Sequence, residues 1–225
     1  MTETLLEAIE IETGKNPSAA IIWMHGLGAD GNDFVPIVRE LKLAATPAIR
    51  FVFPHAPMRP VSINNGYVMR AWYDVTYGDL EGKSKRPDES GVRASEREIV
   101  KLIARERTRG IAAENIVLAG FSQGGALALQ TGLRYPDALA GIMALSTYLP
   151  LAETLAREAS QANRRTPIFM AHGTQDPVVS YAWGSASRRM LEDLGYPVEW
   201  HEYPMPHSVC LEEVNDVAAW LGKVL

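Results

Sequence analysis

A serine framed by glycines, lying between two stretches of opposite character, constrains this chain more than any other feature. Residues 120–125 read Gly-Phe-Ser-Gln-Gly-Gly, follow an aliphatic run at 116–119, and lead into small and straight-chain residues at 126–130. This order predicts a strand, a tight turn and a helix. The G-x-S-x-G pattern carries a mechanism only in that context, because the sharp turn lifts the hydroxyl of Ser122 clear of the sheet. The alternative is a glycine-rich turn with an incidental serine.

Composition places the chain among ordinary globular proteins. Its 225 residues are 47% hydrophobic and 22% charged, which predicts a globular protein with a substantial core. Because α/β folds of this length are commonly single, we expect one domain spanning 1–225. A net charge of −5 argues against a nucleic-acid partner, since phosphate binding needs clustered Lys and Arg. The single cysteine, Cys210, favours a reducing, cytoplasmic location. We expect no signal peptide and no stable membrane insertion, because the N-terminal residues lack a long apolar run.

Apolar runs alternate with helical patterns along the rest of the chain, which predicts a mostly parallel sheet flanked by helices. Residues 5–12 end in alternating apolar and acidic residues, at 9–12, which indicates a half-exposed edge strand. The other predicted strands are 19–24, 50–53, 116–119, 140–146, 167–173 and 198–203. The predicted helices are 33–43, 90–109 with Ser90 as its cap, 126–135, 151–162, 180–194 and 210–224. Ligands are expected beyond the carboxyl ends of the strands.

Two loops next to predicted strand ends are candidates for a binding site. Residues 25–31 are glycine-rich but lack a phosphate-binding fingerprint. In G-x-S-x-G hydrolases such a loop supplies half of an oxyanion hole, which nominates the N–H groups of Leu27 and Gln123. A plain connecting turn is the alternative. In 54–60, three prolines argue against regular structure. The large apolar residues of the loop-like stretch that follows, up to 77, either cap the core or wall a binding cleft or form a flap. Residues 78–87 are expected to be polar and mobile.

A serine nucleophile needs a base, and the base needs an orienting acid. In hydrolases whose serine lies on such a strand–turn–helix turn, the three residues follow along the chain in the order Ser, acid, His. His207, in a proline-framed loop after the last strand, fits the base better than His172 or His201. Asp176 follows a predicted strand and fits the acid. Asp137 suits a turn and Asp193 an exposed helix face, whereas His25 and His172, each followed by glycine, fit structural roles.

The sequence gives no reason to expect a metal or another cofactor, since it has neither H-E-x-x-H nor C-x-x-C. Cys210 falls on the apolar stripe of the final predicted helix, so we expect it to be packed rather than reactive.

Together these motifs resemble the carboxylesterase, lysophospholipase and acyl-protein thioesterase group of α/β-hydrolases. The resemblance spans nearly the whole chain and is carried by residues 25–34, 70–74, 120–125, 173–179 and 207–209. It implies an α/β-hydrolase fold without a large lid domain, a triad of Ser122, Asp176 and His207, and oxyanion donors at Leu27 and Gln123. It also implies a possible homodimer. Residues 146–149 are more similar to the bacterial carboxylesterase branch than to the eukaryotic thioesterases.

The activity expected from these residues is hydrolysis of a small-molecule acyl ester through an acyl-enzyme. Leu27, Trp72 and Tyr148 are the expected apolar wall of the substrate site, which favours short to medium acyl chains. A lysophospholipase or acyl-protein thioesterase is the alternative within the same chemistry. The alternative of another class is a non-catalytic protein that binds an apolar ligand or a partner.

Overall fold

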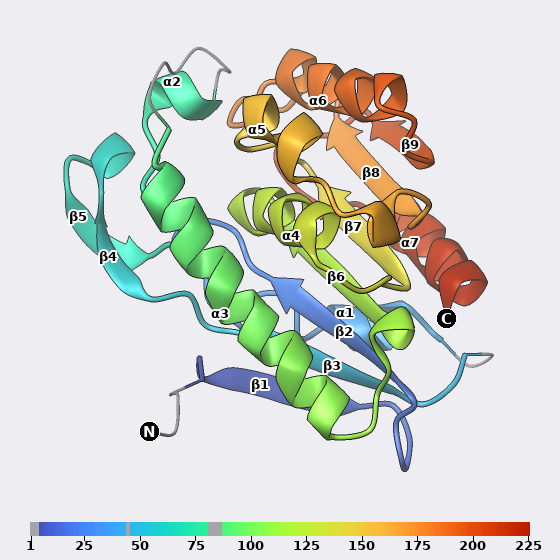
Figure 1. Ribbon diagram of the computed structural model, residues 1–225. Helices are drawn as coiled ribbons and strands as arrows, with labels where there is room; N and C mark the ends of the chain where they lie inside the picture. Colours follow the sequence, from blue (N-terminus) through green and yellow to red (C-terminus); the bar gives the residue numbers. More distant parts are fainter. Residues whose placement is uncertain (1–4, 44–45, 81–86) are drawn as a thin grey trace.

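In the part of the chain that the structure describes, residues 5–43, 46–80 and 87–225, seven strands form one sheet (Figure 1). In the computed structural model their spatial order is β1 (Ala8–Glu12), β3 (Ile49–Pro54), β2 (Ala19–Met24), β6 (Ile116–Phe121), β7 (Gly141–Leu145), β8 (Ile168–Gly173) and β9 (Val198–Tyr203). β1 pairs antiparallel with β3 at one edge, and the other neighbouring pairs are parallel. The predicted mostly parallel sheet with β1 at its edge is confirmed.

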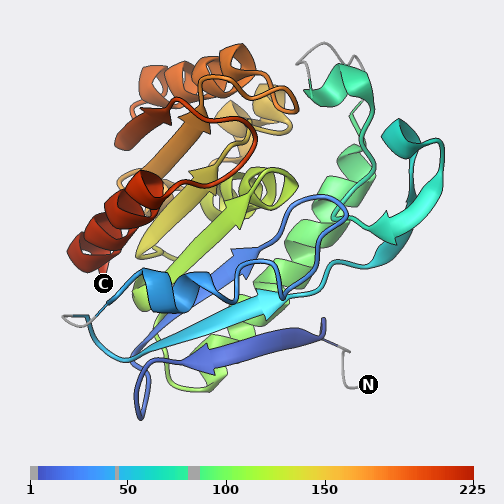
Figure 2. The ribbon, with the colours of Figure 1, turned by 180° about the vertical axis from the view of Figure 1, so that it is seen from behind.

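Helices cover both faces of the sheet. On one face, α3 (Glu89–Thr108), α4 (Gln123–Arg134) and α6 (Tyr181–Asp193) pack on alternate strand residues such as Ile22 and Leu118. On the other face, α1 (Ile37–Glu40) and α7 (Leu211–Val224) pack on the intervening residues, as the rear view shows (Figure 2). The remaining short elements are α2 (Tyr77–Leu80), α5 (Ala152–Glu158) and 3₁₀ turns at Ser62–Asn64, Ala113–Asn115 and Gln161–Asn163. Every residue of β2, β7 and β8 is buried, as expected for strands covered on both sides.

Several helix boundaries differ from the prediction. α4 begins at Gln123, three residues before the predicted start, and α5 ends at Glu158 rather than at 162. Within 33–43 only α1 is helical, because the apolar spacing there reflects packing, as in the Phe34 ring stacked on Trp23 at 5.2 Å. The N-cap of α3 is Asp88 rather than Ser90. The Asp88 carboxylate accepts a hydrogen bond from the Gly91 N–H (2.9 Å), and the Ser90 hydroxyl donates to the same oxygen (2.9 Å).

The prediction that 54–60 cannot form regular structure is wrong, and the loop-like stretch after it also contains a strand. β4 (Met58–Val61) and β5 (Tyr67–Arg70) form an antiparallel hairpin apart from the main sheet (Figure 1). Pro60 fits within β4 because a two-stranded sheet consists only of edges, where a missing N–H is tolerated. The aromatic residues of this region differ in burial. Trp72 is fully buried, as expected of a residue that caps the core, whereas Tyr67 is exposed. Of the stretch expected to be mobile, 78–80 belongs to α2 and 81–86 lies outside the described residues.

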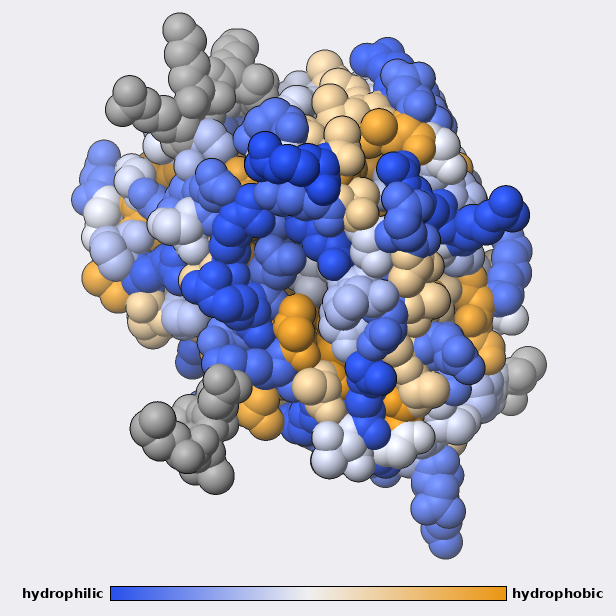
Figure 3. All heavy atoms as spheres, viewed as in Figure 1, coloured by the Kyte–Doolittle hydropathy of each residue, from blue (hydrophilic) through white to orange (hydrophobic). Residues whose placement is uncertain are grey.

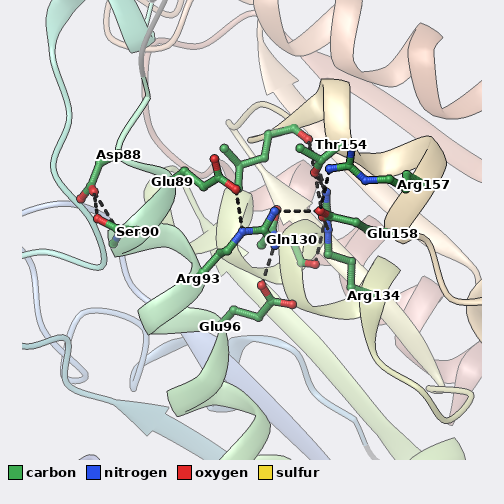
Figure 4. A network of polar contacts seen from close by, with 12 residues as sticks. Asp88, Glu89, Ser90, Arg93, Glu96, Gln130, Arg134, Thr154, Arg157 and Glu158 are labelled. Atoms are coloured by element: carbon green, nitrogen blue, oxygen red, sulfur yellow. Dashed lines mark hydrogen bonds and ion pairs between the residues drawn. The ribbon is translucent and has the colours of Figure 1, made fainter.

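A charged network joins α3, α4 and α5 (Figure 4). Arg93 of α3 donates to Glu158 of α5 at 2.8 Å, and Arg134 at the end of α4 donates to the other carboxylate oxygen at 2.9 Å. Burial alone would raise the pKa of Glu158, but hydrogen bonds from Arg93, Arg134 and Thr154 lower it to about 2. The network therefore anchors the far end of α4, the helix that begins directly after Ser122.

Polar side chains cover most of the face drawn in Figure 3, with small apolar areas between them. Among the described helices, none is long and apolar enough to cross a membrane.

Candidate active site

Ser122 lies at the turn between β6 and α4. β6 is the middle strand in the order of the sheet, so this turn lies near the centre of the sheet (β6 and α4 in Figure 1). Its backbone has φ 56° and ψ −120°, a strained conformation for a residue with a side chain. Two contacts hold this conformation. The Ser122 N–H donates to Leu145 O at 2.8 Å, and the Thr147 hydroxyl donates to Ser122 O at 2.6 Å. The predicted strand–turn–helix context of the serine is confirmed.

The glycines on either side of Ser122 allow the backbone to pass very close to itself. A Cβ on Gly120 would lie 2.2 Å from the carbonyl carbon of Gly124. A Cβ on Gly124 would lie 2.2 Å from Met24 O in β2. Backbone atoms cannot yield by such a distance, so both positions require glycine.

Asp176 and His207 come together at the carboxyl ends of the neighbouring strands β8 and β9. Their contact joins His207 Nδ1 to Asp176 Oδ2 at 2.6 Å. The other carboxylate oxygen of Asp176 accepts the N–H groups of Val178 and Val179 at 2.8 and 2.9 Å. The Asp176 side chain is fully buried. Burial alone would raise the pKa of Asp176, but the bonds from His207 and the two N–H groups lower it, so the carboxylate stays ionised.

The imidazole of His207 lies beside the turn that carries the serine. Its ring packs on Phe121, the residue before Ser122, with centroids 4.6 Å apart. Phe121 is backed in turn by Phe34 at 5.7 Å. The fold thus brings the three predicted triad residues, 122, 176 and 207, from three separate loops to one end of the sheet.

The other two histidines near the strand ends make different contacts. His172 is fully buried, and burial lowers its pKa. Its Nε2 lies 2.9 Å from Val179 O and, more distantly, 3.5 Å from Asp176 Oδ2. His201 on β9 contacts Glu199 at 3.1 Å, away from Ser122 in the topology of the sheet.

The His25 ring is neutral and makes a hydrogen bond at each of its two nitrogens. Its Nδ1 donates to Gly26 O at 2.7 Å and its Nε2 accepts from the Ala56 N–H at 3.1 Å. Burial lowers its pKa to about 4, which keeps this arrangement intact at neutral pH. The ring therefore ties the glycine-rich loop to the segment after β3.

The N–H groups of Leu27 and Gln123 are available as donors. Among the described residues no acceptor takes up either N–H. Gln123 is the first residue of α4, where the helix dipole adds partial positive charge. The side chain of Gln123 has a role that the sequence did not indicate. Its amide bonds the main chain of Trp72 and Tyr73, about 50 positions away, a separation at which local pattern carries no signal.

The three predicted wall residues occupy different environments. Tyr148 lines a cavity of ≈ 290 Å³, where its hydroxyl meets that of Tyr73 at 3.0 Å and its ring stacks on Trp183. Leu27 is partly buried against the core. Trp72 is fully buried and supports the surrounding loops from beneath.

A second, more open groove of ≈ 560 Å³ runs between residues 28–33 and the β4–β5 hairpin. It begins at Gly28, next to the Leu27 N–H. Its hairpin wall includes the exposed apolar side chains of Met58, Tyr67 and Val68.

No group of three or more His, Cys, Asp or Glu residues in 5–43, 46–80 and 87–225 is arranged to hold a metal ion. Cys210 lies at the start of α7 and packs, half-buried, against the core.

Comparison with known proteins identifies the family. A model of the phospholipase/carboxylesterase family matches residues 6–225. Acyl-protein thioesterase 1 of Gibberella zeae is 39% identical, with 92% of this chain and 91% of that protein covered. Carboxylesterase SOBER1 of Arabidopsis thaliana is 35% identical, with 91% and 90% covered.

Solved structures agree. That of Arabidopsis thaliana SOBER1 has a TM-score of 0.84 at 32% identity, covering 92% of this chain and 98% of its own. That of Zea mays acyl-protein thioesterase 2 has a TM-score of 0.81 at 29% identity, covering 97% and 99%. The predicted fold and family resemblance are confirmed, and the chain belongs to the phospholipase/carboxylesterase family of α/β-hydrolases.

Proposed function

We propose that this chain is a serine hydrolase that cleaves carboxylic esters through an acyl-enzyme. The observation that carries the proposal is the 2.6 Å contact between Asp176 and His207 beside the strained Ser122. A buried, ionised carboxylate on Nδ1 fixes the tautomer of His207 that leaves Nε2 free to accept a proton.

In the proposed reaction the Ser122 hydroxyl oxygen bonds to the ester carbonyl carbon while His207 Nε2 takes the hydroxyl proton. The carbonyl oxygen becomes negatively charged and accepts hydrogen bonds from the N–H groups of Leu27 and Gln123. Collapse of this intermediate breaks the bond to the leaving alcohol, which receives the proton from His207. Water then repeats the sequence on the acyl-enzyme, releases the acid and regenerates Ser122.

The proposed substrates carry short to medium acyl chains. The cavity lined by Tyr148 is ≈ 290 Å³, near the lower end of the roughly 300–1,000 Å³ typical of small-molecule sites. Ser122 and His207 do not line it, so we propose it only as the seat of the acyl chain. Its walls include aromatic Tyr148 and Trp183, but also the carboxylates of Asp79 and Glu153. A small cavity with both aromatic and charged lining residues fits a short acyl group better than a long one.

Acyl-protein thioesterase activity is the second candidate. Relatives in Gibberella zeae and Neurospora crassa carry that name, at 39% and 40% identity. The open groove beside Gly28 also offers room for a leaving group larger than a simple alcohol. Turnover of matched oxygen esters, thioesters and lysophospholipids across acyl lengths separates these activities.

Replacement of the nucleophile tests the proposal against a non-catalytic binding role. We expect Ser122→Ala to abolish both p-nitrophenyl butyrate turnover and labelling by a fluorophosphonate, while the fold persists. Wild-type activity in this variant would exclude Ser122 as the nucleophile. A folded wild-type protein that neither hydrolyses nor labels would favour the binding role.

A further inference from the structure

We propose that Trp72 and the side chain of Gln123 position both oxyanion donors relative to one another. This inference rests on the proposed function. The two donors belong to different parts of the fold, the loop after β2 and the first turn of α4. A single segment, residues 70–73, bonds to both parts, and we call it the bridging segment.

On the Leu27 side, the bridging segment holds the main chain on both flanks of the donor. The Trp72 indole N–H donates to His25 O at 2.9 Å. The Gly28 N–H donates to Arg70 O at 2.9 Å. Because His25 and Gly28, on either side of Leu27, are both held by hydrogen bonds, the Leu27 N–H has little freedom to turn.

On the Gln123 side, both ends of the side-chain amide are used. Gln123 Oε1 accepts the Trp72 N–H at 2.8 Å, and Gln123 Nε2 donates to Tyr73 O at 2.7 Å. These groups are buried, with Trp72 at 0%, Tyr73 at 3% and Gln123 at 4% exposure. Loss of either bond therefore leaves a buried polar group unsatisfied.

The bridging segment is itself anchored. The Ser95 hydroxyl of α3 donates to Trp72 O, and Arg70 Nη1 donates to Ala56 O at 2.8 Å. These two bonds fix the bridging segment in place. The four bonds described above, two on the Leu27 side and two on the Gln123 side, therefore link both oxyanion donors to one fixed segment of chain.

This arrangement matters because an oxyanion hole works only when both N–H groups point at one oxygen before the reaction begins. Misplacement by about 1 Å at such a site costs on the order of 10²-fold in rate. A role in core packing alone would instead lower stability and leave the rate of the folded enzyme unchanged. A substitution should therefore lower kcat if the residue positions the donors, and leave kcat unchanged if the residue only packs the core.

The test uses two substitutions that remove hydrogen bonds but keep apolar bulk. Trp72→Phe deletes the indole N–H that reaches His25 O. Gln123→Met deletes both amide contacts while its main-chain N–H remains.

Each has a matched control in which a buried polar group of the same type is removed elsewhere. Trp23→Phe removes a buried indole N–H that has no hydrogen-bond partner among the described residues. Gln130→Met removes a buried amide on α4 that reaches Glu96 instead.

We would measure kcat and KM for p-nitrophenyl butyrate, normalised to the fraction of sites titrated by a fluorophosphonate. We would also measure the inhibition constant of a trifluoromethyl ketone, which adds to the serine and places an oxyanion in the hole. We expect Trp72→Phe and Gln123→Met each to lower kcat by roughly 10- to 100-fold, with KM changed by less than about twofold. The inhibition constant should rise by a similar factor, and both controls should match the wild type.

Folded Trp72→Phe and Gln123→Met proteins with wild-type kcat would overturn the inference, and so would a lowered kcat with an unchanged inhibition constant. Equal losses in the controls would also overturn it, because packing alone would then explain the effect. An inactive wild-type protein would refute the proposed function itself, a separate result.

Discussion

Asp176→Asn is the substitution whose outcome the structure defines most sharply. One carboxylate oxygen of Asp176 accepts two main-chain N–H groups, from Val178 and Val179, and the other faces His207 Nδ1. An asparagine must place its carbonyl oxygen on the two N–H donors. Its NH₂ group then faces Nδ1 of His207.

That orientation reverses the hydrogen bond on the imidazole. Nδ1 of His207 must accept from the amide, so the ring proton moves to Nε2, which can no longer take a proton from Ser122. The geometry stays intact while the tautomer is wrong. For the triad template this change costs about 10⁴ in kcat, equivalent to about 5 kcal/mol of transition-state stabilisation. The loop keeps its two N–H contacts, so we expect a small change in stability.

The assay is steady-state hydrolysis of p-nitrophenyl butyrate, with thermal unfolding of the same samples. We expect Asp176→Asn to lose about four orders of magnitude in kcat with a melting temperature close to that of the wild type. A well-folded variant that retains more than about a tenth of the wild-type rate would refute the tautomer argument and with it the role of Asp176.

Two further substitutions test a buried carboxyl group in α7 and a close backbone contact beside Ser122. Glu213 of α7 is fully buried, and burial raises its pKa to about 8 despite the opposing effect of the Cys210 main chain. The unfolded chain releases the Glu213 proton near pH 4.5, whereas the folded chain releases it only near pH 8. The free energy of unfolding of the wild type therefore falls as the pH rises between these two values, by at most roughly 1.4 kcal/mol per pH unit. In urea titrations Glu213→Gln should therefore gain stability over the wild type at pH 8 relative to pH 5, and an equal difference at both pH values would contradict this. Gly124→Ala should lose activity and melt at a lower temperature, because its Cβ would lie 2.2 Å from Met24 O. Gly222→Ala, with open space around the new methyl group, is the control, and equal behaviour of the two variants would count against the close contact.

The strands could be predicted because their residues report burial directly. Continuous apolar runs such as 19–24 are covered on both faces, and the alternation over 9–12 marks an edge strand. The hairpin at 58–70 could not be predicted in this way, because its pairing depends on contact between its own two strands rather than on a buried face. The short α1 was not predicted because tertiary packing, as between Phe34 and Trp23, gives the same spacing as a helix. The Asp88 cap was missed because Asp88 and Ser90 are both good N-cap residues two positions apart.

The residues proposed for catalysis could be nominated because chain order and loop position constrain them. Asp176 and His207 each follow a predicted strand, and parallel strands end at the same edge. The bridging segment could not be found from the sequence. Its bonds join Trp72 to His25 and to Gln123, pairs that are close only after the sheet has formed.

Trapping the acyl-enzyme tests the central claim most directly. The wild-type protein would be mixed with a p-nitrophenyl ester, quenched in acid within the first turnover, digested and examined by mass spectrometry. The proposed mechanism predicts one acyl group on Ser122, absent from Ser122→Ala. Ester turnover without acylation of Ser122, or acylation at another residue that supports full turnover, would contradict the proposal.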